Sequence, residues 1–204
     1  MKIGWLLAFI CFCGSSCGYR LEEEELEDVG RISISIPFVK GDIDGQLTNA
    51  IVRELASSGS FRYVRDGGRY TLLVTVVHDH KEKIGYRYDR KPKGQLEKNL
   101  VPTEGRRILG AQVSIQESLT GKILLGPTII KASIEYDYVN SDNLADLTFF
   151  SPTGQRLTVL NFSLGQLDSI EGAEDNALDP LYRHMAQKII DGLIGQKWWV
   201  NDSS

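Results

Sequence analysis

The stretch LGAQVSIQESLTGKILLGPTIIKASIEY, residues 109–136, decides the fold class, because apolar and polar side chains alternate along both of its halves. Alternation with a period of two is typical of a strand that buries one face. A tight turn is predicted between the halves, at Thr120–Lys122. The stretch therefore predicts two antiparallel strands. The apolar residues that share a face are Leu109, Ala111, Val113, Ile115 and Leu119 before the turn, and Leu124, Ile130, Ala132, Ile134 and Tyr136 after it.

Three further strand patterns precede this hairpin. Short strands are expected at 32–38 and 61–64, and a long strand starts at Tyr70 and can continue through Tyr88. A loop that contains proline, glycine and basic residues is expected at 91–105. The faces expected to be buried consist of Ile32, Ile34, Ile36 and Phe38 in the first strand, and of Tyr70, Leu72, Val74 and Val76 in the long one.

Two segments have the apolar periodicity of helices, with repeats at three and four residues. The first lies between Gly45 and Gly59, and Asp42 or Asp44 can cap it. The second ends near Ile194 and is expected to start at Asp179 and Pro180, although a helical turn can begin as early as Ala173. The two apolar stripes consist of Leu47, Ile51 and Leu55, and of Leu181, Met185, Ile189 and Leu193.

The predicted element order is strand, helix, several strands and helix. This order favours the α+β class, as a two-layer sandwich of a mostly antiparallel sheet with two helices packed on one face. Residues 139–172 are hard to interpret, although a further strand is possible at 157–162. A single α+β domain is expected over residues 31–200, because nothing in the sequence indicates a repeat or a second core.

The amino terminus has the features of a lipoprotein signal. Lys2 precedes an apolar run, IGWLLAFICFC, which is too short to span a bilayer. Residues 1–16 are therefore expected to be a lipoprotein signal peptide, and Cys17, after Gly-Ser-Ser, the acylated first residue of the mature chain. Cys11 and Cys13 are poorer candidates because bulky residues precede them. The alternative is an ordinary cleaved signal with an incidental cysteine.

Residues 17–30 are expected to form a lipidated acidic tether. Six of the seven residues from Glu22 to Asp28 are acidic, and such a run repels itself and stays extended. It can hold the domain away from an anionic membrane surface, or it can be a solvated tail that contributes only solubility.

Charge and cysteine content exclude several function classes. The chain has 204 residues and a formal net charge of −4, and this becomes −5 when residues 1–16 and their one cation, Lys2, are removed. A mildly acidic protein has no global attraction for nucleic acid. Once Cys17 is acylated no thiol remains, so no intrachain disulfide is possible. No cofactor is expected, because no phosphate-binding glycine loop or catalytic motif is present.

His78 and His80 are the candidate ligands of a metal site. Residues two apart on a strand point to the same side, but that face would also carry Val74 and Val76, and the third histidine, His184, is distant in sequence. Two ordinary histidines near a strand end are the favoured interpretation, so no metal is expected.

A basic stretch lies between His78 and Gly94. Its six cations and three acids give a local charge of +3, and Tyr86 and Tyr88 lie among them. Cations beside aromatic rings suit the phosphates of an amphiphile, and the alternative is a charged hairpin that resists edge pairing. The candidate contacts to such phosphates are Lys81, Lys83, Arg87, Arg90, Lys91 and Lys93.

Six segments together resemble the LptE-type lipopolysaccharide-assembly lipoproteins in content and order. They are CGYR (17–20), ISIPFV (34–39), LTNAIVRELASSGSFRYV (47–64), YTLLVTVV (70–77), QVSIQESLTGKIL (112–124) and PLYRHMAQKIIDGLIGQKWW (180–199). The resemblance implies an outer-membrane lipoprotein on the periplasmic side that plugs an LptD-type β-barrel and helps lipopolysaccharide reach the cell surface. It implies no enzymatic activity.

Two other classes stay open. The segment 47–64 also resembles the helix-then-strand unit of TolB amino-terminal and CsgG-like lipoprotein domains, which act in envelope assembly or secretion. That alternative expects a parallel strand order after the first helix, and the antiparallel run at 106–138 argues against it. An enzyme would need a pocket with converging polar groups.

Overall fold

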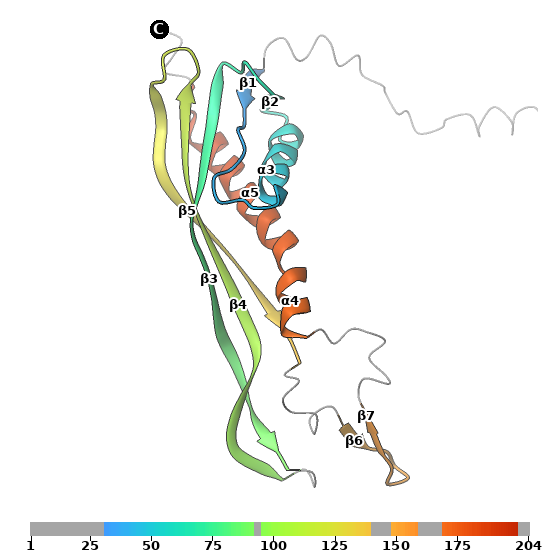
Figure 1. Cartoon of the computed structure of the whole chain (residues 1–204). Coiled ribbons are helices and arrows are strands. Elements are labelled where there is room, and N and C mark those ends of the chain that lie inside the picture. The colour runs from blue at the N-terminus through green and yellow to red at the C-terminus, as the bar shows by residue number, and fades with distance from the viewer. Residues whose placement is uncertain (1–30, 92–94, 140–147, 159–168, 200–204) are drawn as a thin grey trace, which may run out of the picture. The chain divides into compact units, whose positions relative to one another are not determined.

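The computed structural model describes residues 31–91, 95–139, 148–158 and 169–199, so the predicted signal peptide, Cys17 and the predicted acidic tether lie outside the described residues. The α+β prediction is confirmed. A mostly antiparallel sheet of five strands has helices packed against it, in the strand order β2-β1-β3-β4-β5 (Figure 1). The strands of this sheet are β1 (Ile32–Ser35), β2 (Phe61–Val64), β3 (Tyr70–Arg90), β4 (Leu96–Glu117) and β5 (Ile123–Asp137).

The remaining elements within the described residues are three helices and a small hairpin. The helices are α3 (Gln46–Ser57), α4 (Ile170–Asn176) and α5 (Leu178–Gln196). The hairpin pairs β6 (Thr148–Phe150) with β7 (Arg156–Thr158) in antiparallel register. The predicted strand at 157–162 thus coincides with β7 at Leu157 and Thr158, and its other residues lie outside the described ranges.

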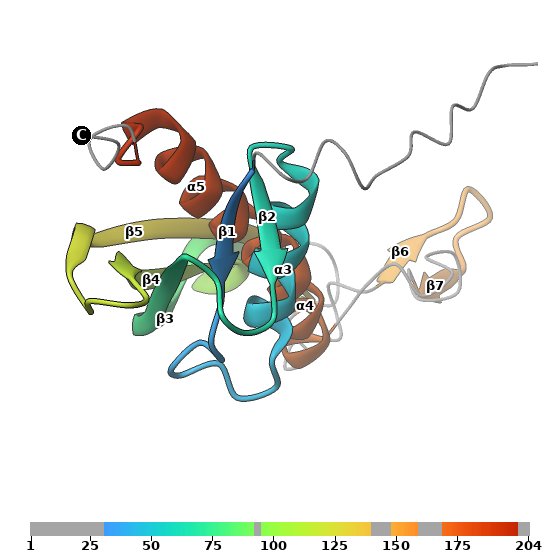
Figure 2. The same ribbon diagram turned by 90° about the horizontal axis from the view of Figure 1, so that it is seen from above.

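The sheet combines two pairing modes. Strand β1 is parallel to both of its neighbours, β2 and β3, and Figure 2 shows the arrows of β1 and β2 side by side with the same direction. Helix α3 connects β1 to β2, as a parallel connection requires. Strands β3, β4 and β5 are antiparallel, in agreement with the alternation and the turn of residues 109–136.

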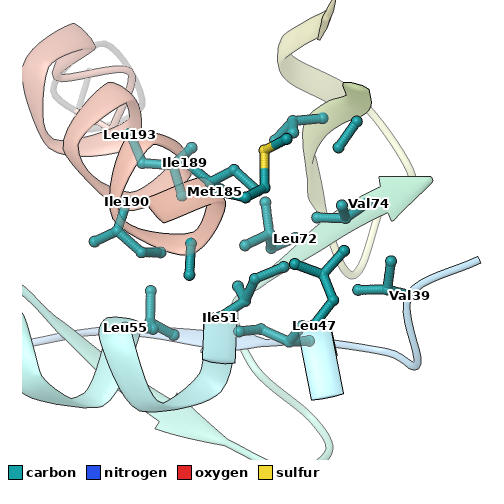
Figure 3. Packing of buried hydrophobic residues seen from close by; sticks show 14 of the residues in the cluster. Val39, Leu47, Ile51, Leu55, Leu72, Val74, Met185, Ile189, Ile190 and Leu193 are labelled. Atoms are coloured by element: carbon teal, nitrogen blue, oxygen red, sulfur yellow. The ribbon is translucent and has the colours of Figure 1, made fainter. Parts of the chain in front are cut away.

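The core lies between the helices and one face of the sheet (Figure 3). The predicted stripe of α3 is fully buried at Leu47, Ile51 and Leu55. It faces the stripe of α5 and the sheet residues Leu72 and Val74. The buried α5 residues are Leu181, Met185, Ala186, Ile189, Ile190 and Leu193. The apolar side chains of the helices repeat every 3.6 residues and those of the strands every two. Both sets therefore meet in one apolar cluster.

Two residues expected on buried faces are exposed instead. Phe38 is 62% exposed, because β1 ends at Ser35 and Pro37 interrupts the alternation. Val39 is buried in its place. Leu119 is also exposed, because it lies in the turn between β4 and β5 and not in the strand.

Both predicted caps of the first helix make contacts. The Asp42 carboxylate accepts hydrogen bonds from the Thr48 backbone N–H (2.7 Å) and the Thr48 hydroxyl (2.6 Å). The Asp44 carboxylate accepts one from the Gln46 backbone N–H (3.1 Å). These bonds satisfy donors that the first turn of a helix leaves unpaired.

The carboxy-terminal helical region begins earlier than expected. Helix α4 precedes α5, and the Ser169 hydroxyl caps it by accepting a bond from the Gly172 N–H (3.2 Å). Asp179 does not cap α5. It lies inside the first turn, where it forms an ion pair with Arg183 (2.5 Å).

The predicted loop at 91–105 is mostly strand. Strand β4 begins at Leu96, so the connection between β3 and β4 is short. Pro102 is tolerated because it lies just beyond the last pair of β4 with β5, Glu104 with Asp137, where β4 becomes an edge strand.

We expect the core to be most sensitive where α3 contacts α5. The substitution Ile51→Ala should lower the free energy of unfolding by about 2–5 kcal/mol, because it leaves a cavity at a fully buried position. Urea denaturation measures the effect, with Ile43→Ala at a fully exposed position as the control. Equal stability of the two variants would contradict this packing.

Candidate functional site: the β3–β4 arm

Strands β3 and β4 extend beyond the rest of the sheet as a two-stranded ribbon. Strand β5 stops at Asp137, opposite Glu104, whereas β3 and β4 continue to pair as far as Arg90 with Leu96 (Figure 1). We call residues 85–90 and 96–103 the arm. A two-stranded ribbon has little stability of its own in water, because it needs packing against something else. The side chains on the surface of the arm therefore indicate what the arm packs against.

One face of the arm is apolar and exposed. Tyr88 pairs directly with Leu100, and Tyr86, two residues away, pairs with Pro102. The side chains of Tyr86, Tyr88, Leu96 and Leu100 are 53–62% exposed. We call these four residues the apolar face. On the opposite side of the ribbon, Arg87 pairs with Val101, which is buried.

The predicted basic residues do not all belong to one surface. Lys83, Arg87 and Lys91 are exposed on or next to the arm. Lys81 lies nearer the sheet, where its ammonium group donates to the Glu174 carboxylate of α4 (2.6 Å). This ion pair makes Lys81 a structural contact. The Arg90 side chain and Lys93 lie outside the described residues, so their predicted role is untested.

The base of the arm contains a second ion pair. The Arg107 guanidinium donates two hydrogen bonds to the Asp79 carboxylate, at 2.8 and 2.6 Å. These bonds lower the pKa of Asp79 below its ordinary value, against an opposing effect of burial. Asp79 is opposite the buried Leu109, so this pair and Lys81 lie on the helix side of the sheet.

A bulge explains how charged residues reach the helix side. Val76 pairs with Ala111 and His78 with Gly110, so Val77 is an extra residue in β3. The even-numbered residues face the core before the bulge, and the odd-numbered residues face it afterwards. His78 and His80 therefore do not share a face with Val74 and Val76, contrary to the sequence interpretation.

The outer face of the sheet carries another charge cluster. Arg106 donates to the Glu135 carboxylate (2.6 and 3.1 Å) and to the Glu82 carboxylate (3.1 Å). These ion pairs are exposed to solvent, and exposed ion pairs contribute little to the free energy of unfolding. Among the residues that the structure describes, no group of histidine, cysteine and acidic side chains could hold a metal ion.

The β4 half of the arm lies in the segment predicted as a loop. Leu96 and Leu100 complete the apolar face, and the exposed Lys98 lies between them. The signal was a pair of leucines, Leu96 and Leu100, whose even spacing places them on one face of a strand. The nearby proline and glycine residues hid this pattern.

Comparison with known proteins identifies similar folds only. No family model and no curated protein matches the sequence. A minor lipoprotein from Acinetobacter baumannii has 15% identity over 78% of this chain and 87% of its own (TM-score 0.44). The rare lipoprotein B from Shewanella oneidensis has 14% identity over 83% and 98% (TM-score 0.39). A hypothetical protein from Chlamydia trachomatis has 8% identity over 80% and 96% (TM-score 0.43).

Two of these three similar structures are bacterial lipoproteins. Within the described ranges, no helix combines the length and apolar character that crossing a bilayer requires.

The Asp79–Arg107 pair should make stability depend on pH. Folding lowers the pKa of Asp79. The ionised carboxylate therefore adds to the free energy of unfolding above its ordinary pKa of 3.8, and this stabilisation is lost as the pH falls through the pKa of the folded state. Asp79→Asn should cost about 1 kcal/mol at neutral pH, a modest figure because the Asp79 side chain is 40% exposed. The loss in free energy of unfolding caused by Asp79→Asn, measured by urea denaturation, should be smaller at about pH 3 than at neutral pH. Asp66→Asn, at a highly exposed position, is the control. A cost for Asp79→Asn that is the same at both pH values would contradict the assignment.

Proposed function

We propose that this chain is an outer-membrane lipoprotein, anchored on the periplasmic side, that assists the transport of lipopolysaccharide to the cell surface. Its partner would be a large outer-membrane β-barrel of the LptD type, which it would serve as a plug and chaperone without enzymatic activity. The sequence resemblance supports this proposal, because the segments that carry it include β2, most of α3 and most of α5.

The observation that carries the proposal is the exposed arm. Lipopolysaccharide combines phosphorylated sugars with acyl chains. The arm offers tyrosine and leucine side chains on its apolar face, with Lys83, Arg87, Lys91 and Lys98 exposed on or near it. Cations form charge-assisted hydrogen bonds with phosphates, and aromatic rings pack on sugars and hydrocarbon. This combination fits an anionic amphiphile better than it fits a purely polar ligand.

The anchor would be Cys17. Several acyl chains on one residue hold a protein on a membrane, because each buried methylene contributes about 0.8 kcal/mol. The acidic run from Glu22 to Asp28 would then separate the domain from the anionic surface by charge repulsion.

The substitution Cys17→Ala should leave an unprocessed or soluble protein. Fractionation of the cell envelope, with labelling by a radioactive fatty acid, measures both membrane partition and acylation. Cys13→Ala is the matched control and should keep both. Wild-type partition of Cys17→Ala would contradict the assignment of the anchor.

Removing charge from the arm should weaken lipopolysaccharide binding. We expect a triple variant of Lys83, Arg87 and Lys91 to alanine to lose at least tenfold in affinity, or about 1.4 kcal/mol. Binding of the wild-type chain to purified lipopolysaccharide should also weaken between about 50 and about 300 mM salt.

The matched control removes three exposed cations elsewhere, at Lys40, Arg62 and Lys122, and should bind as the wild type does. If the arm variant and this control bind equally well, lipopolysaccharide does not contact the arm.

One observation favours the second candidate, a TolB amino-terminal or CsgG-like assembly module. The parallel pairing of β1 with β2 around α3 is the arrangement that this alternative expects. The antiparallel β3–β4–β5 region is the arrangement that argues against it. Absence of any lipopolysaccharide binding by the wild-type chain would favour this alternative.

A further inference from the structure

The open edge of the main sheet lies along β5, the last strand in its order. The Tyr138 N–H donates to the Thr103 carbonyl (3.0 Å), which shows that the backbone groups of Tyr138 point toward β4. In an antiparallel ladder this direction alternates from residue to residue. Ser133, Glu135 and Asp137 therefore point their N–H and C=O groups away from β4. Lys131 has the same parity, and its carbonyl accepts a bond from the Lys188 ammonium group of α5 (2.9 Å).

These outward groups lack partners in the described part of the chain. The hydrogen bonds of that part include none from the outward N–H or to the outward C=O of Ser133, Glu135 or Asp137. A row of unpaired backbone groups on an edge is a template for another strand. The available edge is short. Toward the start of β5, Lys188 covers Lys131, and Pro127 has no N–H to donate.

A cavity of about 250 Å³ lies beside this part of the edge. Figure 1 shows the end of β5 next to α4. More of the lining surface of this cavity is apolar than polar. The lining residues are Ile134, Glu135, Tyr136 and Asp137 on β5 and Ala173, Asn176, Ala177 and Pro180 on the helices. An edge strand with a helix alongside and a pocket between them is the geometry by which proteins bind extended peptides. The edge would supply main-chain hydrogen bonds, and the pocket would accept one apolar side chain.

The charges around the open edge and the cavity indicate which side chains a strand added at this edge would carry. Glu135, Asp137, Glu171 and Asp175 are exposed along β5 and α4. Of these four carboxylates, Glu135 forms an ion pair with Arg106, which also pairs with Glu82. In an added strand, side chains next to Glu135 and Asp137 would alternate with the side chain that enters the cavity. Cations are favoured at those positions.

We propose that Ser133–Asp137 and the adjoining helices form a strand-addition site for an extended segment of a partner protein, in which basic and apolar residues alternate. A second copy of this chain fits poorly, because pairing β5 with β5 would bring the carboxylates of Glu135 and Asp137 against one another. The site is separate from the arm, so the proposal does not depend on lipopolysaccharide transport.

The test is a titration of the isotope-labelled full chain, in detergent, with the peptide KVKVKVK, followed by NMR. We expect saturable shifts and slowed amide exchange at Ser133, Glu135 and Asp137. The peptides EVEVEVE and KSKSKSK should bind at least tenfold more weakly, because the first has the wrong charge and the second cannot fill the cavity.

Two substitutions separate the contributions. Ser133→Pro removes an outward N–H without removing a bond to β4 or changing the charge, and it should weaken binding at least tenfold. Ile129→Pro is the matched control. It has the same parity on the same edge, beyond Lys131, and should change the affinity less than about twofold. Ala173→Leu, which fills the cavity, should weaken KVKVKVK binding and leave KSKSKSK binding unchanged.

Three results would overturn the proposal. The first is no binding of KVKVKVK to the wild-type chain up to about 1 mM, since even weak strand addition is detectable there. The second is equal binding by the wild type and Ser133→Pro. The third is a concentration-dependent dimer that Ser133→Pro abolishes, which would assign this edge to a second copy.

Discussion

The structure depends on the contact of α3 and α5 with each other and with one face of the sheet. Leu47, Ile51 and Leu55 meet the apolar stripe of α5, and both stripes rest on the strands. The last residue of β3 that packs in this layer is Val76. Strand β3 is 21 residues long and β4 is 22, so both extend far beyond the region that the two apolar stripes cover. A sheet face that no apolar layer covers must carry polar side chains, form ion pairs with a neighbouring element or bind another molecule.

The residues at this boundary show how the chain accommodates it. The bulge at Val77 exchanges the faces of β3, and charged residues replace apolar ones on the helix side. Asp79 with Arg107, and Lys81 with Glu174, fill the space where α4 approaches the strands. Each of these charges has a partner nearby, so the polar layer does not bury an isolated charge. The helix-side packing of the main sheet therefore changes from apolar contact to ion pairs along its length.

Much of this arrangement was predictable, because its main signals are local. The alternation at 109–136 indicated the β4–β5 hairpin, and the stripes of both long helices were correct residue by residue. The bulge at Val77 was not predictable from the sequence. One extra residue in a strand is visible only in its pairing with the partner strand. Leu96 and Leu100 were assigned to a loop for a related reason. Pro102 is incompatible with a central strand, and only the early end of β5 makes β4 an edge there. At the candidate site, the cations were evident from composition, but the contact of Lys81 with Glu174 joins residues 93 apart in sequence.

The arm and the open edge of β5 have a common origin and opposite character. Strand β5 stops at Asp137, so the continuing strands form the arm, and its end leaves an open edge beside α4. The arm exposes Lys83, Arg87, Lys91 and Lys98, whereas the edge is bordered by Glu135, Asp137, Glu171 and Asp175. A ligand attracted to one surface is repelled by the other, because charges of opposite sign select opposite partners. An anionic amphiphile at the arm would therefore not compete with a basic strand at the edge. Because Glu174 lies on α4 and pairs with Lys81 of β3, the helix beside the edge is also tied to the base of the arm. This ion pair is a direct contact between the helix beside the edge and the strand that continues into the arm.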